Sequence, residues 1–253
     1  MTARPAVDLP RTRWSEAEGR VRVDLAACYR LVARFRMSDL VYTHISARVP
    51  GGEHFLLNPY GLMFEEVTAS NLVKIDIDGN VVEDTSHTVN PAGFTIHSAV
   101  HRARPDIACV LHTHTRAGMA VAATERGLLP LSQIALQFYG RLATHDYEGI
   151  ALDLDERERI ARDLGDRKAM ILRNHGLLTA GATVAEAFSL MYYLERACEI
   201  QVSALSMGEA LVLPSPEVCE RAARQYEEDE PCGEREWRAL LRELNRSEPG
   251  YKN

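Results

Sequence analysis

Two histidine-bearing segments constrain the fold of this 253-residue chain more than any other feature. The first is His112-Thr113-His114, which ends an apolar, β-prone run that begins at Cys109. Alternate residues of a strand share one face, so His112 and His114 are predicted to project together while Thr113 points the other way. Two imidazoles on the same face of one strand can converge on a single cation.

The second segment carries His175, between two short β-like runs at 169–172 and 177–180. Asn174 and Gly176 flank it and favour a turn, which would bring the two runs together. Three neutral imidazoles with an open fourth position form the catalytic type of zinc site rather than the closed structural type. The competing interpretation is that such a pair arises by chance and that a lone turn histidine lies at the surface or in the core. Spacing alone leaves both open.

The composition is that of an ordinary globular protein, with 46% hydrophobic and 26% charged residues. A formal net charge of −7 argues against a general nucleic-acid or anionic-membrane surface. No apolar run is long enough to span a bilayer, and the segment from Met1 to Trp14 lacks the apolar core of a signal peptide. Five widely spaced cysteines without a C-x-x-C pair indicate reduced thiols. We therefore expect a cytoplasmic protein.

Hydrophobic periodicity predicts an N-terminal arm at 1–14, a domain at 15–213 and a peripheral, charged helical tail at 214–253. Capping boxes at Ser15–Glu18 and Thr183–Glu186 predict the starts of two long amphipathic helices. Strands interleaved with helices indicate one α/β domain whose central sheet is covered by helices. Strands are expected at 41–49, 54–57, 72–77, 109–114, 134–139, 142–145, 169–172 and 177–180, and helices at 15–37, 65–71, 91–104, 116–124, 155–164 and 183–207.

Over about residues 17–210 the chain resembles the class II aldolase and adducin head-domain family. The resemblance implies a three-layer α/β/α sandwich with a mixed, mainly antiparallel sheet, and a homo-oligomer, with the tetramer favoured. It also implies a small-molecule substrate and a divalent metal on His112, His114 and His175, with zinc first and manganese or iron as alternatives. The matching motifs are Thr43–Arg48, Asn58–Gly61, Ala92–His97, His101–Asp106, His112–His114 and Arg173–Gly176.

The chain departs from the sugar-phosphate aldolases of that family at the general base and at the phosphate site. Their acid/base glutamate, four residues before the helix histidine, corresponds to Gly93, and the serine pair before it corresponds to Pro91-Ala92. A phosphate-loop asparagine corresponds to His44, and a threonine of the second phosphate loop corresponds to Tyr60. The metal ligands are therefore kept without the base, and the run 90–95 looks more like the adducin-type branch.

Other residues are candidates for the missing roles. His145 and Glu148 follow a predicted strand and, with Tyr60, are the candidate catalytic groups, because a histidine near a metal can act as a base at neutral pH. His145 can equally be a strand-end histidine bonded to backbone. His97 and His101, one helical turn apart, are interpreted as partners of ligating imidazoles or as packing residues. The candidate substrate-binding residues are His44, Arg48, Asn58, Gly61 and Gly93.

Three functional hypotheses follow. The first is a metal-dependent lyase-like enzyme that performs aldol cleavage or decarboxylation on a small, non-phosphorylated hydroxy-carbonyl or hydroxy-acid. The glycine at the base position suits decarboxylation, which needs an electron sink but no proton-abstracting glutamate there. The second is a non-catalytic, adducin-like interaction module with a retained metal site. The third is an Fe(II)-dependent oxygenase on the same three histidines, although the common oxygenase triad uses two histidines and a carboxylate.

Overall fold

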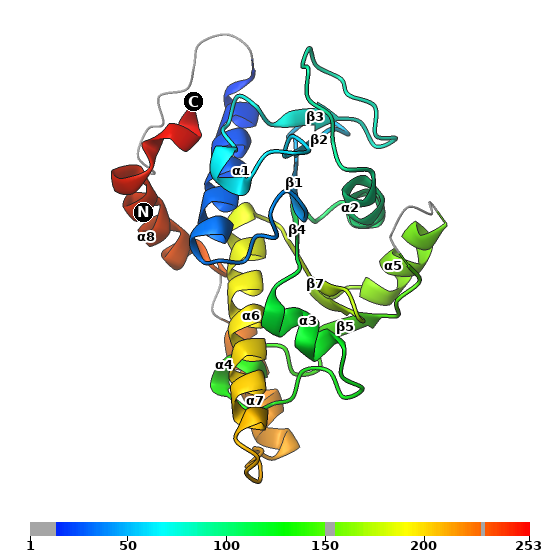
Figure 1. Ribbon diagram of the computed structural model, residues 1–253, viewed down its shortest axis with the longest axis vertical. Coiled ribbons are helices and arrows are strands. Elements are labelled where there is room, and N and C mark those ends of the chain that lie inside the picture. The colour runs from blue at the N-terminus through cyan, green and yellow to red at the C-terminus, as the bar shows by residue number, and fades with distance from the viewer. Residues whose placement is uncertain (1–13, 150–154, 229–230) are drawn as a thin grey trace.

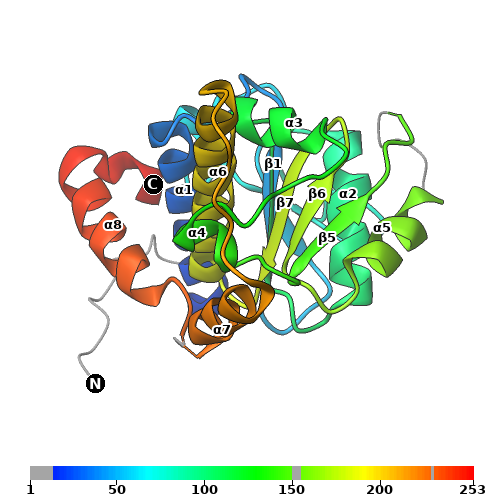
Figure 2. The same cartoon turned by 90° about the horizontal axis from the view of Figure 1, so that it is seen from below.

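The computed structural model describes residues 14–149, 155–228 and 231–253 of the chain. Its centre is a seven-stranded sheet in the order β3-β2-β1-β4-β7-β6-β5, with helices on both faces (Figures 1 and 2). Neighbouring strands are antiparallel except for β5 and β6, which are parallel. This confirms the predicted three-layer sandwich with a mixed, mainly antiparallel sheet. Of the predicted N-terminal arm, 1–14, only Trp14 lies within the described residues.

The first three strands form the expected antiparallel meander, which the turns between them allow. β4 then enters the middle of the sheet between β1 and β7, and β6 and β7 form a hairpin. The strands are β1 (His44–Arg48), β2 (Phe55–Leu57), β3 (Val73–Ile75), β4 (Cys109–Thr113), β5 (Leu142–His145), β6 (Ala169–Leu172) and β7 (Gly176–Gly181).

One face of the sheet is covered by α1 and α6, and the other by α2 and α5 (Figure 2). The N-termini of α1 and α6 are capped by the side chains of Ser15 and Thr183, as the sequence predicts. The helices are α1 (Glu16–Arg34), α2 (Pro91–Ala103), α3 (Arg116–Ala122), α4 (Gln133–Leu136), α5 (Glu156–Leu164), α6 (Val184–Ser206), α7 (Pro216–Glu227) and α8 (Glu234–Ser247), with short 3₁₀ turns η1 (Phe64–Glu66) and η2 (Pro249–Lys252).

Alternation along β4 divides its side chains between two hydrophobic clusters. Cys109 and Leu111 belong to the cluster under α1 and α6, whereas Val110 belongs to the cluster under α2 and α5. His112 therefore lies on the α2 side, and Thr113 faces Met191 of α6. The register that buries these apolar side chains also decides which face of the sheet receives the histidines.

The strand predicted at 134–139 is wrong, because this segment contains the short helix α4. The hydroxyl of Ser132 caps α4 by accepting a hydrogen bond from the Ala135 backbone N–H. Buried Ala135, Leu136 and Phe138 face α6 and α7 at helical rather than alternating spacing. Packing against two helices thus decides the conformation of a short apolar run that periodicity leaves ambiguous.

The tail after residue 213 is helical in two pieces, α7 and α8. Trp237, Leu244 and Tyr251 are fully buried and belong to the cluster under α1 and α6. The tail therefore supplies part of the core, while the division of the chain at residue 213 stays a prediction. Of the helices in the described parts of the chain, none combines the length and the apolar character needed to cross a membrane.

Candidate metal centre

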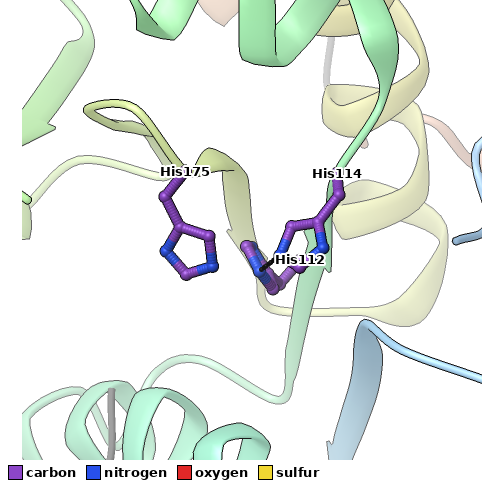
Figure 3. Close-up of side chains that lie close together, drawn as sticks. All are labelled: His112, His114 and His175. Atoms are coloured by element: carbon purple, nitrogen blue, oxygen red, sulfur yellow. Dashed lines mark hydrogen bonds between the residues drawn. The ribbon is translucent and has the colours of Figure 1, made fainter. Parts of the chain in front are cut away.

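Three imidazoles meet where the end of β4 faces the hairpin between β6 and β7 (Figure 3). His112 lies on β4, His114 directly follows it, and His175 lies in the turn of the hairpin. One ring nitrogen of each lies within 4.8 Å of the others. The Nε2 atoms of His112 and His114 are 2.9 Å apart. Residues about sixty positions apart in sequence are thus brought together by strand pairing.

The hairpin turn requires special backbone geometry on both sides of His175. Asn174 has a φ of +54°, a left-handed conformation that asparagine tolerates better than most residues. A Cβ atom at Gly176 would lie 2.3 Å from the carbonyl oxygen of Thr113 and 3.2 Å from the His114 ring. Only glycine lets β7 approach β4 closely enough to place His175 beside the other two imidazoles.

The outer nitrogens of two of these rings already have partners. Nδ1 of His112 is 2.9 Å from the carbonyl oxygen of Leu177, and Nδ1 of His114 is 3.0 Å from Oδ2 of Asp39. Both partners are acceptors, so each Nδ1 carries the proton and each Nε2 presents a lone pair. Two lone pairs that face each other at 2.9 Å repel unless a cation or a proton lies between them. This arrangement fits a metal bound through Nε2 of both histidines.

Burial keeps His112 and His175 neutral at physiological pH. The pKa of His112 lies well below its ordinary value, mainly because of burial and then because of the charges that His175, His44 and His114 would carry. The pKa of His175 is lowered to about 4, again by burial first and then by His114 and His145. Neutral imidazole is the form that binds a metal, so these two histidines need little proton release to bind one.

His44 lies directly beside the three imidazoles. It is paired with His112 across β1 and β4, and the two ring centroids are 5.1 Å apart. A Cβ atom at Gly93 would lie 2.6 Å from Cδ2 and 3.1 Å from Nε2 of His44. The imidazole of His44 thus occupies the space into which a side chain at position 93 would extend, so this ring arrangement leaves no room for a glutamate there.

Two of the remaining predicted substrate-binding residues, Arg48 and Asn58, already have protein partners. The Arg48 guanidinium donates to the backbone carbonyls of His101 and Ile107. The amide oxygen of Asn58 accepts a hydrogen bond from the buried hydroxyl of Tyr29. Gly61 occupies a turn with a φ of +94°, and the neighbouring Tyr60 is 43% exposed. Their roles toward a substrate stay predictions.

His145 and Glu148 line the same small cavity as His175. Nδ1 of His145 is 2.8 Å from Oδ2 of Asp163, and its Nε2 is 3.5 Å from a carboxylate oxygen of Glu156. Glu148 forms an ion pair with Arg159. His145 is the last residue of β5, and both residues are already held by charged partners; their catalytic roles stay predictions.

Sequence reasoning missed two residues that the structure connects to the site. Asp39, which orients His114, lies 75 positions away in a loop before β1, and no local pattern marks it. Ser46 bonds both His97 and His101. The sequence does mark Ser46, because it lies two residues after His44 on the same face of β1 and is therefore a buried polar residue that needs a hydrogen-bond partner.

Comparison with known proteins places this geometry in context. Residues 23–202 match the family described as the Class II Aldolase and Adducin N-terminal domain. A Caulobacter vibrioides protein, provisionally named an aldolase class 2 protein, is 55% identical over 94% of this chain and 93% of its own length. Alpha-adducin of Rattus norvegicus is 48% identical over 80% of this chain, which spans only 28% of that protein.

Two solved structures share the fold over almost the whole chain. An aldolase II superfamily protein from Pseudomonas syringae has a TM-score of 0.92 and 55% identity, covering 95% of this chain and 98% of its own. An L-fuculose 1-phosphate aldolase from Glaciozyma antarctica PI12 has a TM-score of 0.85 and 27% identity, covering 96% of this chain and 97% of its own.

Proposed function

Because the chain belongs to the class II aldolase and adducin N-terminal domain family, we propose that it is a metal-dependent lyase-like enzyme. Its reaction is aldol cleavage or decarboxylation of a small hydroxy-carbonyl or hydroxy-acid substrate. The observation that carries this proposal is the convergence of three imidazoles, two of which present facing lone pairs. A divalent metal on His112, His114 and His175, with zinc proposed first and manganese or iron as alternatives, supplies a Lewis acid for substrate oxygens.

The protein groups around the three imidazoles orient them. Asp39 and the carbonyl of Leu177 fix the ring tautomers, and partners of this kind commonly raise metal affinity by one to two orders of magnitude. The sheet and α2 bury His112, so water is excluded from one side of the site. A substrate must therefore approach from the side of His114 and His175, which are less buried.

The residues around Gly93 favour a substrate without phosphate. The resemblance assigns phosphate binding to a serine pair, an asparagine and a threonine. This chain has Pro91-Ala92, the buried and neutral His44 and Tyr60 at those positions, so the two serine hydroxyls are lost. With no carboxylate at Gly93, decarboxylation fits better than a reaction that needs a base at that position. His145 and Glu148 remain in the proposal as groups that border the cavity beside His175.

The experiment that tests the proposal is a metal analysis by plasma mass spectrometry on protein purified without chelators. Wild type should contain about one equivalent per chain, His112→Ala should lose it, and the matched control His87→Ala should keep it. The metal found is then used to screen hydroxy-acids and aldol substrates. If neither wild type nor control holds metal after zinc, manganese and iron are offered, the enzyme proposal fails.

A second candidate, an interaction module, is favoured by the 48% identity with alpha-adducin. It predicts that His112→Ala abolishes metal binding but leaves partner capture unchanged, whereas the enzyme proposal predicts loss of turnover. The oxygenase alternative has less support, because no carboxylate joins the three-histidine group within the described parts of the chain.

We also propose that the protein is a homo-oligomer, with the tetramer favoured, and that it is cytoplasmic. Sedimentation velocity tests the oligomeric state.

A further inference from the structure

A buried chain of hydrogen bonds runs from His44 into the layer between β1 and α2. Nδ1 of His44 is 2.7 Å from Nε2 of His97, and Nδ1 of His97 is 2.6 Å from Oγ of Ser46. Ser46 Oγ is in turn 2.7 Å from Nε2 of His101. All four residues are at most 4% exposed. Proton positions along this chain are therefore set by the protein and not by solvent.

The number of available protons limits how the donors and acceptors of this hydrogen-bond chain can be arranged. A neutral imidazole carries one N–H, and Ser46 has one hydroxyl proton. With one proton in each contact, the donors point either all away from His44 or all toward it. If His97 and His101 both donated to Ser46, the hydroxyl proton would be left without an acceptor in a fully buried position, which is costly. Two arrangements of the chain therefore remain.

The surroundings of His101, at the far end of the hydrogen-bond chain, distinguish these two arrangements. Nδ1 of His101 is buried and forms no hydrogen bond within the described residues. Burial and then the charge of Arg48 lower the pKa of His101 to about 3, while the backbone carbonyl of Ile107 acts in the opposite direction. Because Ser46 occupies Nε2, we infer that this carbonyl acts on the side of Nδ1, although the two do not form a hydrogen bond. An N–H on Nδ1 is attracted by a carbonyl oxygen, whereas a lone pair there is repelled, so the donors point away from His44.

We propose that Ser46, His97 and His101 are positioning residues that keep the proton of neutral His44 on Nδ1, so that its Nε2 accepts a hydrogen bond from the hydroxyl of a bound hydroxy-carbonyl or hydroxy-acid. Among the described residues, Nε2 of His44 has no hydrogen-bond partner of its own. It lies beside Gly93, where the ring takes the place of the absent side chain. The choice of ligand rests on the proposed function, whereas the proton position on His44 does not.

The proton position can be measured directly by long-range ¹H–¹⁵N NMR on the full chain labelled with ¹⁵N-histidine, as purified and after zinc is added. His44→Gln identifies the His44 signals by their loss. In wild type we expect His44 with its proton on Nδ1. Ser46→Ala removes the acceptor of the His97 Nδ1–H, so the His97 proton moves to Nε2 and that of His44 moves to Nε2 as well.

Ser98→Ala is the matched control, because Ser98 lies next to His97 but its hydroxyl donates to the Thr95 carbonyl and not to the hydrogen-bond chain. It should leave the His44 signals as in wild type. A wild-type His44 protonated on Nε2, or a Ser46→Ala spectrum identical to wild type at His44, overturns the positioning role. Neither result depends on metal content or turnover, so a failure of the proposed function is distinguishable from a failure here.

The hydroxyl-binding part is tested with glycolate and methoxyacetate, which differ by a blocked hydroxyl. Zinc-loaded wild type should bind glycolate more tightly than methoxyacetate. In His44→Phe the ratio of the two affinities should fall about fivefold, which corresponds to the loss of one ordinary hydrogen bond. An equal preference in the two proteins refutes a contact between His44 and the hydroxyl.

Discussion

The carboxyl group of Glu195 makes the stability of this protein depend on pH near neutrality. Glu195 lies on α6 and is 7% exposed. Its carboxylate accepts hydrogen bonds from the Thr115 hydroxyl and from the Gly118 backbone N–H at 3.1 Å, which caps the first turn of α3 directly after His114. Burial, the largest effect, nevertheless raises the pKa of Glu195 from 4.5 to about 7, with a smaller contribution from Glu199.

The size of this pH effect follows from the difference between the pKa of Glu195 in the folded protein and its pKa in the unfolded chain. A pKa raised from 4.5 to about 7 corresponds to about 3 kcal/mol, at about 1.4 kcal/mol per pH unit. The folded state holds this proton more tightly than the unfolded chain does. The stabilisation is therefore fully present below pH 4.5 and is lost as the pH rises through 7. Glu195→Gln carries no charge and should escape this loss.

The assay is urea unfolding at several pH values from 5 to 8, at one protein concentration. The free energy of unfolding of Glu195→Gln relative to wild type should rise with pH, by about 2–3 kcal/mol across this range. Altered hydrogen bonding in the variant adds the same amount to this free-energy difference at every pH. It does not affect the test, because only the change of the difference with pH is compared. Val212→Ala, at a 90% exposed position, changes no ionisable group, so it is the control and should show a flat difference. A flat difference for Glu195→Gln would refute the argument.

Three further predictions concern the site and the tail. Gly93→Ala should displace the His44 ring and cost about 1–3 kcal/mol of unfolding free energy; unchanged His44 NMR signals would contradict the close contact. Asp39→Asn should weaken zinc affinity about tenfold in a chelator competition, whereas equal affinity would mean that Asp39 does not orient His114. Trp237→Ala should lower the free energy of unfolding in urea by about 3–5 kcal/mol. The control Val212→Ala, at a 90% exposed position, should leave it nearly unchanged. A loss below about 1 kcal/mol for Trp237→Ala would show that α8 is not part of the core.

Much of the fold follows from local patterns along the chain. Ser15 and Thr183 mark helix starts because a side-chain oxygen can satisfy a free backbone N–H there. The apolar run before His112 predicts a buried strand, and the two-residue spacing predicts that His112 and His114 project together. These inferences succeed because they depend on neighbouring residues alone. The family resemblance then supplied the layered architecture.

Tertiary structure alone decided the contacts between distant segments. The segment 134–139 is helical because α6 and α7 pack against it, although its composition suits a strand equally well. His44 lies beside His112 because β1 pairs with β4 in one particular register. Asp39 reaches His114 across 75 positions. Periodicity encodes which face of an element is buried, but the pairing of elements depends on the packing of the whole core, so the orientation of the three imidazoles and the hydrogen-bond chain behind His44 could be read only from the folded chain.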